Sequence, residues 1–166
     1  MEREIHDQVW VFMPRGEFRP AIESCKDLNA RYPAYAPGWH VAGNLALRLG
    51  NVSKSIDFIK RAIKLKPENP MWTLQYGHCC AGQGELEQAL ALARTINRKY
   101  LESANLCSSL GDLFCRLEDY EVALRCYLPA AGKAPKNKNN HYNLAAVYLF
   151  LGEFELAEQK MHAMQC

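Results

Sequence analysis

Apolar side chains recur along this chain at the three- and four-residue spacing of amphipathic helices, with short polar breaks between the helical segments. Near the N-terminus Ile5, Val9 and Phe12 form one such stripe, and the Pro-Arg-Gly break at residues 14–16 follows it. A second helix is expected to begin near Glu17. The first 35 residues therefore predict two helices joined by a tight turn.

The stretch from 104 to 137 indicates how such a pair of helices would pack. Gly111 and Ala123 are small at the places where the two helices would cross, so that backbone can approach backbone. Phe114 and Tyr127 would fill the wedge beside the crossing. Pro135 lacks a backbone donor and would stop the second helix before the next pair begins.

This layout returns every 34 residues without an insertion. It divides the whole chain into five units, at residues 2–35, 36–69, 70–103, 104–137 and 138–166, of which the last is truncated. The eighth place of the units reads Val9, Gly43, Gly77, Gly111 and Ala145. The twentieth place reads Ala21, Ser55, Ala89, Ala123 and Ala157. The turn place holds a glycine in four units, with Glu118 as the exception among Gly16, Gly50, Gly84 and Gly152.

The phased residues resemble the tetratricopeptide repeat (TPR), a unit of two antiparallel helices. The resemblance implies an all-α fold, a right-handed superhelical solenoid of antiparallel helix pairs with about ten helices, in a single domain over residues 1–166. It also implies a non-catalytic module that binds a peptide or protein segment in its concave groove. It implies no cofactor.

The last two units resemble a narrower group. The runs SLGDLFCRLEDYEVALRCY and HYNLAAVYLFLGEFELAEQ are similar to the N-terminal repeat region of bacterial TPR proteins that carry a C-terminal sulfotransferase domain. The similarity covers roughly residues 89–159, and the phosphosulfate-binding elements of the sulfotransferase have no counterpart here. The alternative function is therefore a regulatory or scaffolding arm of a larger sulfotransferase-type enzyme. TPR chaperones of type III secretion have a similar length but about three repeats, so they rank lower.

In a TPR array the groove is lined by the first helix of each unit, at its second, fifth, ninth, twelfth and thirteenth places. Here these places hold a mixture of aromatic, Met, Arg, His and Asn side chains, which suits an extended or helical peptide. The candidate groove residues are Arg3, His6, Trp10, His40, Asn44, Arg48, Met71, His78, Asn105, Asp112, Arg116 and Tyr142, with Leu47, Leu74, Ser108, Asn139 and Ala146 at the same places.

One well-known TPR variant clamps a C-terminal carboxylate pair with two lysines, an arginine and two asparagines. In this sequence Asn44 takes a matching place, but His40 stands where a lysine is needed. Asn105 and Ser109 stand where a lysine and an arginine are needed. Binding of chaperone C-terminal tails is therefore not predicted, and a different linear peptide is expected.

Composition and charge exclude several classes of function. The formal net charge is +2, with basic and acidic residues interspersed, so nothing favours binding of nucleic acid. No apolar run reaches the roughly 18 residues of a membrane span, and the N-terminus has no signal-peptide pattern, so a cytoplasmic protein without membrane contact is expected. No nucleophile, base and orienting group form a recognisable motif, so no enzymatic activity is predicted.

Seven cysteines invite a metal or disulfide interpretation, which their positions oppose. Cys25 and Cys107 fall on places that are normally apolar, and no C-x-x-C pair occurs, so the cysteines are interpreted mostly as small buried hydrophobes. His6, His40 and His78 lie on three successive units, too far apart to share one ion. No metal site is predicted.

Two stretches depart from the pattern. In residues 93–103 Leu101 replaces the usual proline and Ile96 the usual alanine, which predicts a displaced or altered helix end. At the C-terminus Phe154, Leu156, Met161 and Met164 would need an apolar neighbour, and no polar capping helix follows. The chain is therefore either a piece of a longer protein or covers this end by self-association.

Overall fold

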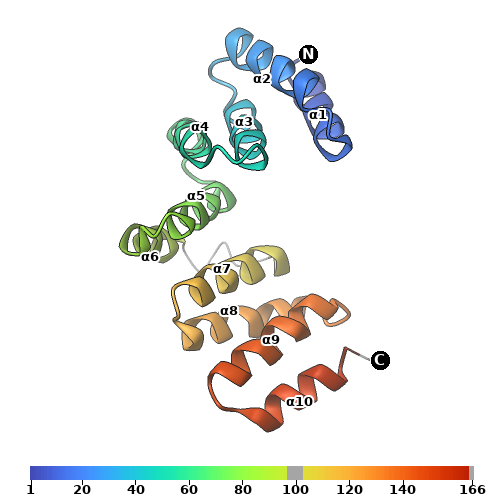
Figure 1. The fold of residues 1–166 in the computed structure, drawn as a ribbon, viewed down its shortest axis with the longest axis vertical. Coiled ribbons are helices and arrows are strands. Elements are labelled where there is room, and N and C mark those ends of the chain that lie inside the picture. The colour runs from blue at the N-terminus through green and yellow to red at the C-terminus, as the bar shows by residue number, and fades with distance from the viewer. Residues whose placement is uncertain (97–102, 165–166) are drawn as a thin grey trace. The chain divides into compact units, whose positions relative to one another are not determined.

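The structure, a computed structural model, describes residues 1–96 and 103–164. All regular structure within these residues is helical, as the sequence predicts, with ten α-helices and one short 3-10 helix (Figure 1). None of the described helices is long and apolar enough to cross a membrane. The elements are α1 (Glu2–Phe12), η1 (Met13–Arg15), α2 (Phe18–Arg31), α3 (Ala36–Arg48), α4 (Val52–Leu65), α5 (Pro70–Gly82), α6 (Leu86–Thr95), α7 (Ala104–Arg116), α8 (Tyr120–Lys133), α9 (Lys138–Phe150) and α10 (Phe154–His162).

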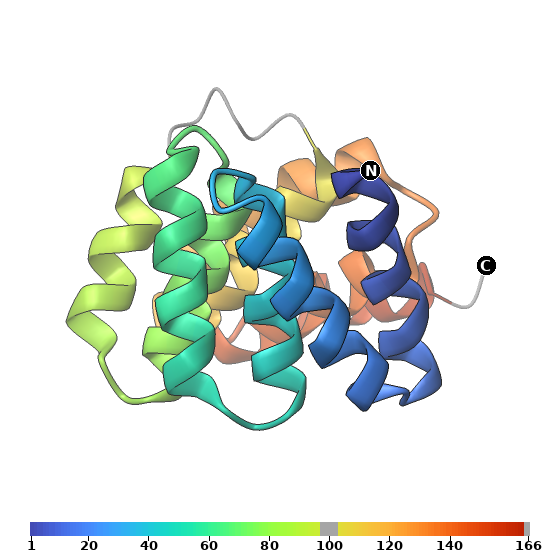
Figure 2. The same ribbon diagram turned by 90° about the horizontal axis from the view of Figure 1, so that it is seen from above.

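Consecutive helices pack as hairpins. The pairs α1–α2, α3–α4, α7–α8 and α9–α10 are in extensive contact, and Figures 1 and 2 both show α3 and α4 running side by side. The first helices of the hairpins begin 34 residues apart, at Glu2, Ala36, Pro70, Ala104 and Lys138. The periodicity of the sequence is therefore also the periodicity of the helix starts.

Unit 1 is one of two compact units into which the chain divides, and it comprises residues 1–79. Its main apolar cluster joins α1, α2 and α3 through side chains such as Val9 and Val41. A second cluster packs Trp39 of α3 with Ala62 of α4 and Trp72 of α5. Each helix therefore buries one apolar stripe against its neighbours, which is the source of most helical stability in proteins.

Unit 2 comprises residues 80–166, so the division falls inside α5. Leu113 and Phe114 of α7, Ala123 of α8 and Leu144 of α9 are buried and form its core. The helix α10 buries Ala157 at the twentieth place of its unit. The small residue at this place lets α10 lie close to α9.

The turn within every hairpin passes through the left-handed region of backbone conformation. Gly16, Gly50, Gly84 and Gly152 have φ angles of 72°, 76°, 83° and 80°. Glu118 takes the same place between α7 and α8 with a φ of 59°, although its Cβ disfavours this conformation. The position that breaks the glycine pattern in the sequence therefore keeps the same backbone.

The glycines at the helix crossings have two different neighbours. A Cβ on Gly43 would lie 3.3 Å from the backbone oxygen of Ser55 and 2.9 Å from Ile59 Cγ1, so backbone approaches backbone between α3 and α4 as predicted. A Cβ on Gly111 would instead lie 2.5 Å from Tyr127 Cε1. The missing side chain at Gly111 therefore makes room for the Tyr127 ring.

The second helices end where the sequence predicts. Three of them run for 14 residues and stop two residues before a proline, α2 before Pro33, α4 before Pro67 and α8 before Pro135. The helix α6 has ten residues and ends at Thr95, with the buried Ile96 next in the chain. This agrees with the predicted change of helix end, while Leu101 lies outside the described residues.

The cysteines of the described residues are free, and most are buried. Burial raises the pKa of the Cys25 thiol to about 12 and that of Cys126 to about 11. Cys107 and Cys80 are fully buried, in agreement with their interpretation as small hydrophobes. Cys166 lies outside the described residues.

Candidate functional site

The candidate groove residues lie on the first helices of the hairpins. In unit 1 these helices are α1, α3 and α5 as far as Cys79, and in unit 2 they are α7 and α9. The surface of these helices that carries the candidate residues is named here the first-helix face of its unit.

Three side chains on the first-helix face of unit 1 hold one another by hydrogen bonds. Gln75 Nε2 of α5 donates to Asn44 Oδ1 of α3 at 2.7 Å. His40 Nε2 lies 2.9 Å from Gln75 Oε1 and 3.0 Å from Asn44 Nδ2, so it donates to the first when it carries the proton and accepts from the second when it does not. Asn44 Nδ2 in turn donates to the backbone oxygen of His40 at 3.3 Å. This amide-imidazole cluster ties α3 to α5.

His40 is the titratable member of the cluster. Its ring stacks on Trp72 with centroids 5.3 Å apart and an interplanar angle of 25°. Burial lowers the pKa of His40, outweighing the hydrogen bond to Gln75, which raises it, while nearby His6 lowers it further. The neutral imidazole is therefore favoured over the cation.

His6 and Trp10 form a second contact on α1. Trp10 Nε1 donates to His6 Nε2 at 3.1 Å, so His6 carries its proton on Nδ1, which donates to Asp7 Oδ1 at 3.0 Å. The His6 ring also meets Tyr35 edge to face, with centroids 6.1 Å apart. Trp10 remains 41% exposed, so it presents an aromatic surface to solvent.

The other candidates in unit 1 differ in exposure. Met71 and Leu47 are exposed apolar side chains, and Arg3 and Arg48 are exposed cations. Leu74 is only 1% exposed, so its assignment to the groove is wrong and it belongs to the core. The next residue, Gln75, takes the surface position instead. His78 is partly buried.

A polar cleft of about 360 Å³ lies on the first-helix face of unit 2. Its walls come from α7, α9 and the residue before α9, and carry amide, hydroxyl and carboxylate groups. The lining residues are Asn105, Ser108, Ser109, Asp112, Asn137, Asn139, Asn140 and Asn143. Four of these stand at sequence-predicted places, namely Asn105, Ser108, Asp112 and Asn139.

Asp112 is the charged group of the cleft. Its Oδ1 accepts a 2.6 Å hydrogen bond from Tyr127 Oη and a 3.3 Å bond from Asn143 Nδ2. Burial and the hydrogen bond to Asp112 raise the pKa of the Tyr127 phenol, which therefore stays a donor. Two elements besides its own thus orient this exposed carboxylate, α8 through Tyr127 and α9 through Asn143.

Asn140 fixes the floor of the cleft. It is 2% exposed, and its Nδ2 donates to the backbone oxygens of Ala130 at 3.0 Å and Ala134 at 3.3 Å. Ala130 lies in the last turn of α8 and Ala134 is its C-cap, and each of these carbonyls also accepts one backbone N–H, from Ala134 and Asn137. Asn140 Oδ1 accepts from Ser108 Oγ at 2.8 Å. The amide therefore joins α7, α8 and α9.

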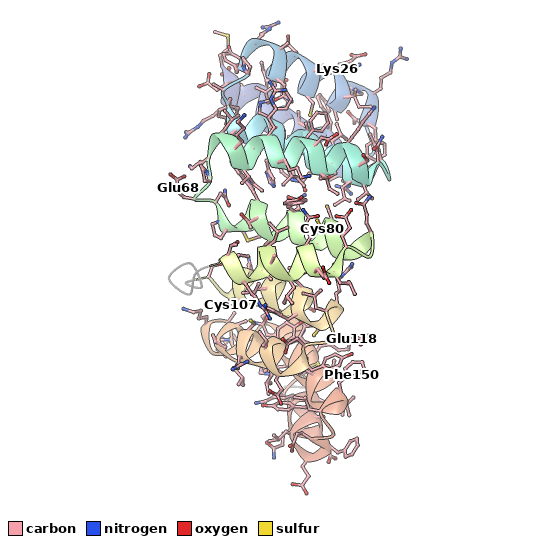
Figure 3. All side chains as sticks on the ribbon, turned by 90° about the vertical axis from the view of Figure 1, so that its left-hand side faces the viewer. Lys26, Glu68, Cys80, Cys107, Glu118 and Phe150 are labelled. Carbon is pink, nitrogen blue, oxygen red and sulfur yellow. The ribbon has the colours of Figure 1, made fainter. Side chains whose placement is uncertain are left out.

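The remaining candidates in unit 2 lie outside the cleft lining. Arg116 is exposed in the last turn of α7, and Tyr142 is exposed on α9. On α10, Phe154 and Met161 are exposed. Phe150, at the end of α9 and labelled in Figure 3, stacks on Tyr120 of α8. Self-association through the last hairpin stays a prediction.

Sequence reasoning missed several members of both polar clusters. Gln75 and Asn143 stand at the sixth place of their units, and each binds the ninth place of the preceding unit, 31 residues earlier. Asn140 stands at the third place of its unit. It accepts a hydrogen bond from Ser108, at the fifth place of the preceding unit, 32 residues earlier. A search for polar residues 31 or 32 positions apart could have found them.

The clusters offer hydrogen-bonding groups and one negative charge to a ligand. Amide and carboxylate groups along α7 and α9 offer hydrogen bonds to the N–H and C=O groups of a peptide and a negative charge to a cation. Among residues 1–96 and 103–164, no three His, Cys, Asp or Glu side chains gather closely enough to hold a metal ion.

Comparison with known proteins connects this architecture to a family. The tetratricopeptide repeat family matches residues 40–100 and 109–164. Among curated relatives, the BBSome complex member BBS4 of Bos taurus is 25% identical over 89% of this chain and 28% of its own length. The TPR repeat-containing thioredoxin TTL4 of Arabidopsis thaliana is 33% identical over 57% of this chain and 14% of its own length. The chain thus spans less than a third of either relative.

Solved structures share the fold at low identity. MamA from Desulfovibrio magneticus RS-1 has a TM-score of 0.79 and 15% identity over 99% of this chain and 93% of its own. Pseudomonas aeruginosa pilF has a TM-score of 0.84 and 13% identity, covering 99% and 75%. Because the family match spans well over half of the residues, and the hairpins, turns and crossings follow the repeat, the chain belongs to the tetratricopeptide repeat family.

Proposed function

We propose that the first-helix faces of this chain bind an extended segment of another protein. The tetratricopeptide fold is that of a protein-protein interaction module. The finer proposal is that the ligand segment lies along the first helices, with its backbone against the amides and one cationic side chain at Asp112. The candidate residues named from the sequence are its contact residues, apart from the buried Leu74.

The polar cleft of unit 2 is the observation that carries this proposal. A peptide in extended conformation has unpaired N–H and C=O groups, which lose water on binding and need new partners. The exposed side chains of Asn105 and Asn139 supply both donors and acceptors. Asp112 is already oriented by Tyr127 and Asn143, so little side-chain freedom is lost when a cation binds it.

Unit 1 supports the same proposal with different chemistry. The polar atoms of His40, Asn44 and Gln75 are largely engaged with one another, so this cluster serves mainly as a rigid support. The exposed Trp10 and Met71 then offer apolar surface for side chains of the ligand, of the kinds that are enriched at protein interfaces.

Binding of short blocked peptides from a positional-scanning library tests the proposal. We expect selected peptides to carry a lysine or arginine, and the Asp112→Asn variant to bind them about tenfold more weakly, because the charge-assisted bond is lost. This variant keeps an oxygen that accepts from Tyr127, so the fold is retained. Glu121→Gln, an exposed carboxylate on α8, should leave the affinity unchanged.

Three further variants test the contribution of both faces. Isothermal titration of the selected peptides against His40→Ala, Asn44→Ala and Arg116→Ala should give weaker binding, after circular dichroism has confirmed folded protein. Equal affinities for all variants would remove the first-helix faces as the binding site.

The proposal includes a non-catalytic role in the cytoplasm. The dispersed Ser, His and Asp residues form no recognised catalytic arrangement, and the free cysteines suit a reducing compartment. No described feature of the structure and neither of the curated relatives named above favours a sulfotransferase arm or a secretion chaperone. Only protein binding is therefore taken further.

A further inference from the structure

The last hairpin, formed by α9 and α10, has large apolar side chains in solvent. Tyr142 is 63% exposed, Leu149 47% and Met161 40%. Among the described helices, only α9 packs extensively against α10, and the two lie side by side (Figure 1). The spacing of four and three residues between Tyr142, Ala146 and Leu149 places them on one side of α9. On α10, Met161 and Met164 are likewise one helical turn apart.

In the preceding repeat the equivalent surface is covered by a first helix. Ser108 and Asp112, at the fifth and ninth places on α7, form hydrogen bonds with side chains of α9. The backbone oxygen of Ala130, at the twenty-seventh place on α8, accepts a hydrogen bond from α9 as well. One first helix therefore covers both helices of the hairpin before it. The same three places of the last repeat hold Tyr142, Ala146 and Met164.

Unit 1 has the same arrangement where α3 follows α2. Cys25 and Leu28, at the twenty-fourth and twenty-seventh places on α2, are 5% and 0% exposed and pack in one cluster with Val41 of α3. Met161 stands at the twenty-fourth place of the last repeat and remains exposed in the described part of the chain. A helix thus covers this surface elsewhere in the chain, and its exposure to water is unfavourable. We name as the outer face of the last hairpin the residues Tyr142, Ala146, Leu149, Met161 and Met164.

The chemistry of the outer face differs from that of two earlier repeats. Asn44 and Asp112, at the ninth place, each accept a hydrogen bond from an amide on the next first helix. Ala146, at the ninth place of the last repeat, has no such acceptor in its side chain. A first helix with an amide at its sixth place, as in α5 and α9, would leave that amide without its partner. An apolar occupant is therefore favoured over another helix of this kind.

The N-terminal hairpin of a second copy does not supply an apolar surface. A first helix packs on the preceding repeat through its third, seventh and tenth places. In α3 these hold Gly38, which lies against α2, and Ala42 and Leu45, which belong to the apolar cluster shared with α1 and α2. In α1 the same places hold Glu4, Gln8 and Val11. Head-to-tail stacking would remove the Glu4 carboxylate and the Gln8 amide from water against apolar side chains, which costs free energy.

We propose that the outer face of the last hairpin binds the same face of a second copy of this chain, in a dimer with twofold symmetry. A symmetric contact brings apolar side chains of one copy against apolar side chains of the other and needs no complementary polar group. The flexible thioethers of Met161 and Met164 can adapt to such a contact. The dimer does not depend on the proposed peptide binding. Tyr142 belongs to both sets of residues, so the test uses Leu149 and Met161 instead.

Sedimentation equilibrium of the full chain, with reductant present so that no cysteine cross-links two copies, tests the proposal. We expect the mass to rise with concentration from monomer to dimer and no further. Leu149→Lys and Met161→Lys should each weaken the dimer about tenfold or more, because the lysine would lose water in an apolar contact. Both positions are exposed, so the variants should stay folded, which circular dichroism checks.

Two controls separate this contact from others. Leu65→Lys, at an exposed apolar position of α4 outside the outer face, should leave the dimer unchanged. Val11→Lys, on α1, reports on head-to-tail stacking and should also have no effect. A monomer across the whole concentration range, species larger than the dimer, full dimerisation of Leu149→Lys and Met161→Lys, or an equal loss in Val11→Lys would each overturn the proposal.

Discussion

Gln75 Nε2 of α5 donates a 2.7 Å hydrogen bond to Asn44 Oδ1 of α3, 31 residues earlier in the chain. The same spacing joins Asn143 of α9 to Asp112 of α7 at 3.3 Å. In both pairs the sixth place of one repeat reaches the ninth place of the preceding repeat. The helices α3 and α5 of unit 1, and α7 and α9 of unit 2, are therefore each joined by a polar pair.

Replacing Gln75 by methionine tests the contribution of this pair. The Gln75→Met variant keeps the length of the side chain but removes the hydrogen-bonding groups that Gln75 presents to the amide oxygen of Asn44 and to His40 Nε2. We expect the free energy of unfolding to fall by about 1–2 kcal/mol, because unpaired groups in a partly buried cluster lose a hydrogen bond each. Urea unfolding followed by circular dichroism measures this change.

Gln159→Met is the matched control for that measurement. Gln159 is exposed on α10, so the same chemical change should alter stability by less than about 0.5 kcal/mol. Equal effects of the two substitutions would show that the pair between α3 and α5 contributes nothing of its own.

The sequence predicts the hairpins because their determinants repeat at fixed places. Each unit has a small residue at its helix crossing and a fixed turn place, and most have a proline after the second helix. Each of these acts within its own unit, so one unit predicts the next. Even Glu118 follows this rule, since the turn place determined its φ although the residue is not glycine. Leu74 stands at a groove place of the repeat, but its apolar side chain is buried in the core. The place in the repeat alone therefore does not predict that a side chain is exposed.

The parts that the sequence did not predict depend on distances between repeats. Gln75, Asn140 and Asn143 act through partners in the preceding unit, so their roles are visible only when two units are compared.

Adding a methyl group at Gly111 should destabilise unit 2. A Cβ there would lie 2.5 Å from Tyr127 Cε1 and 2.7 Å from Cδ1, and this ring is 3% exposed and cannot move freely. We expect Gly111→Ala to lower the free energy of unfolding by about 1–3 kcal/mol, the usual effect of overpacking. In Gly132→Ala, on α8, the added Cβ meets nothing within 4 Å, so stability should rise by about 0.5–1 kcal/mol. Thermal unfolding distinguishes the two signs.

Replacing Glu118 by glycine should stabilise the chain. The residue has a φ of 59°, which disfavours any side chain with a Cβ. Relief of this strain exceeds the extra entropy of glycine in the unfolded chain, so Glu118→Gly should add about 0.5–1 kcal/mol. Conversely, Gly50→Ala, at the same place with a φ of 76° and no atom near its Cβ, should remove about 1 kcal/mol. A loss of stability in Glu118→Gly would contradict this account.

The stability of unit 1 should depend on pH through His40. Burial lowers its pKa in the folded protein below the ordinary value of 6.5. Above about pH 6.5 both states are neutral and the contribution is full. As the pH falls below 6.5 the unfolded chain binds the proton first, so stability is lost until the pKa of the folded state is reached. Urea unfolding between pH 8 and pH 5 measures this loss.

The His40→Gln variant isolates this effect from the other histidines. Glutamine does not titrate, so only the wild type loses stability through residue 40 as the pH falls from 7 towards 5. The unfolding free energy of the wild type minus that of the variant should therefore decrease over this range. The His162→Gln variant, changed at an exposed position on α10, retains His40. It should therefore lose stability below pH 6.5 as the wild type does. Parallel curves for wild type and His40→Gln across this range would mean that burial does not disfavour the charged imidazole, and the neutral imidazole inferred for the amide-imidazole cluster would be wrong.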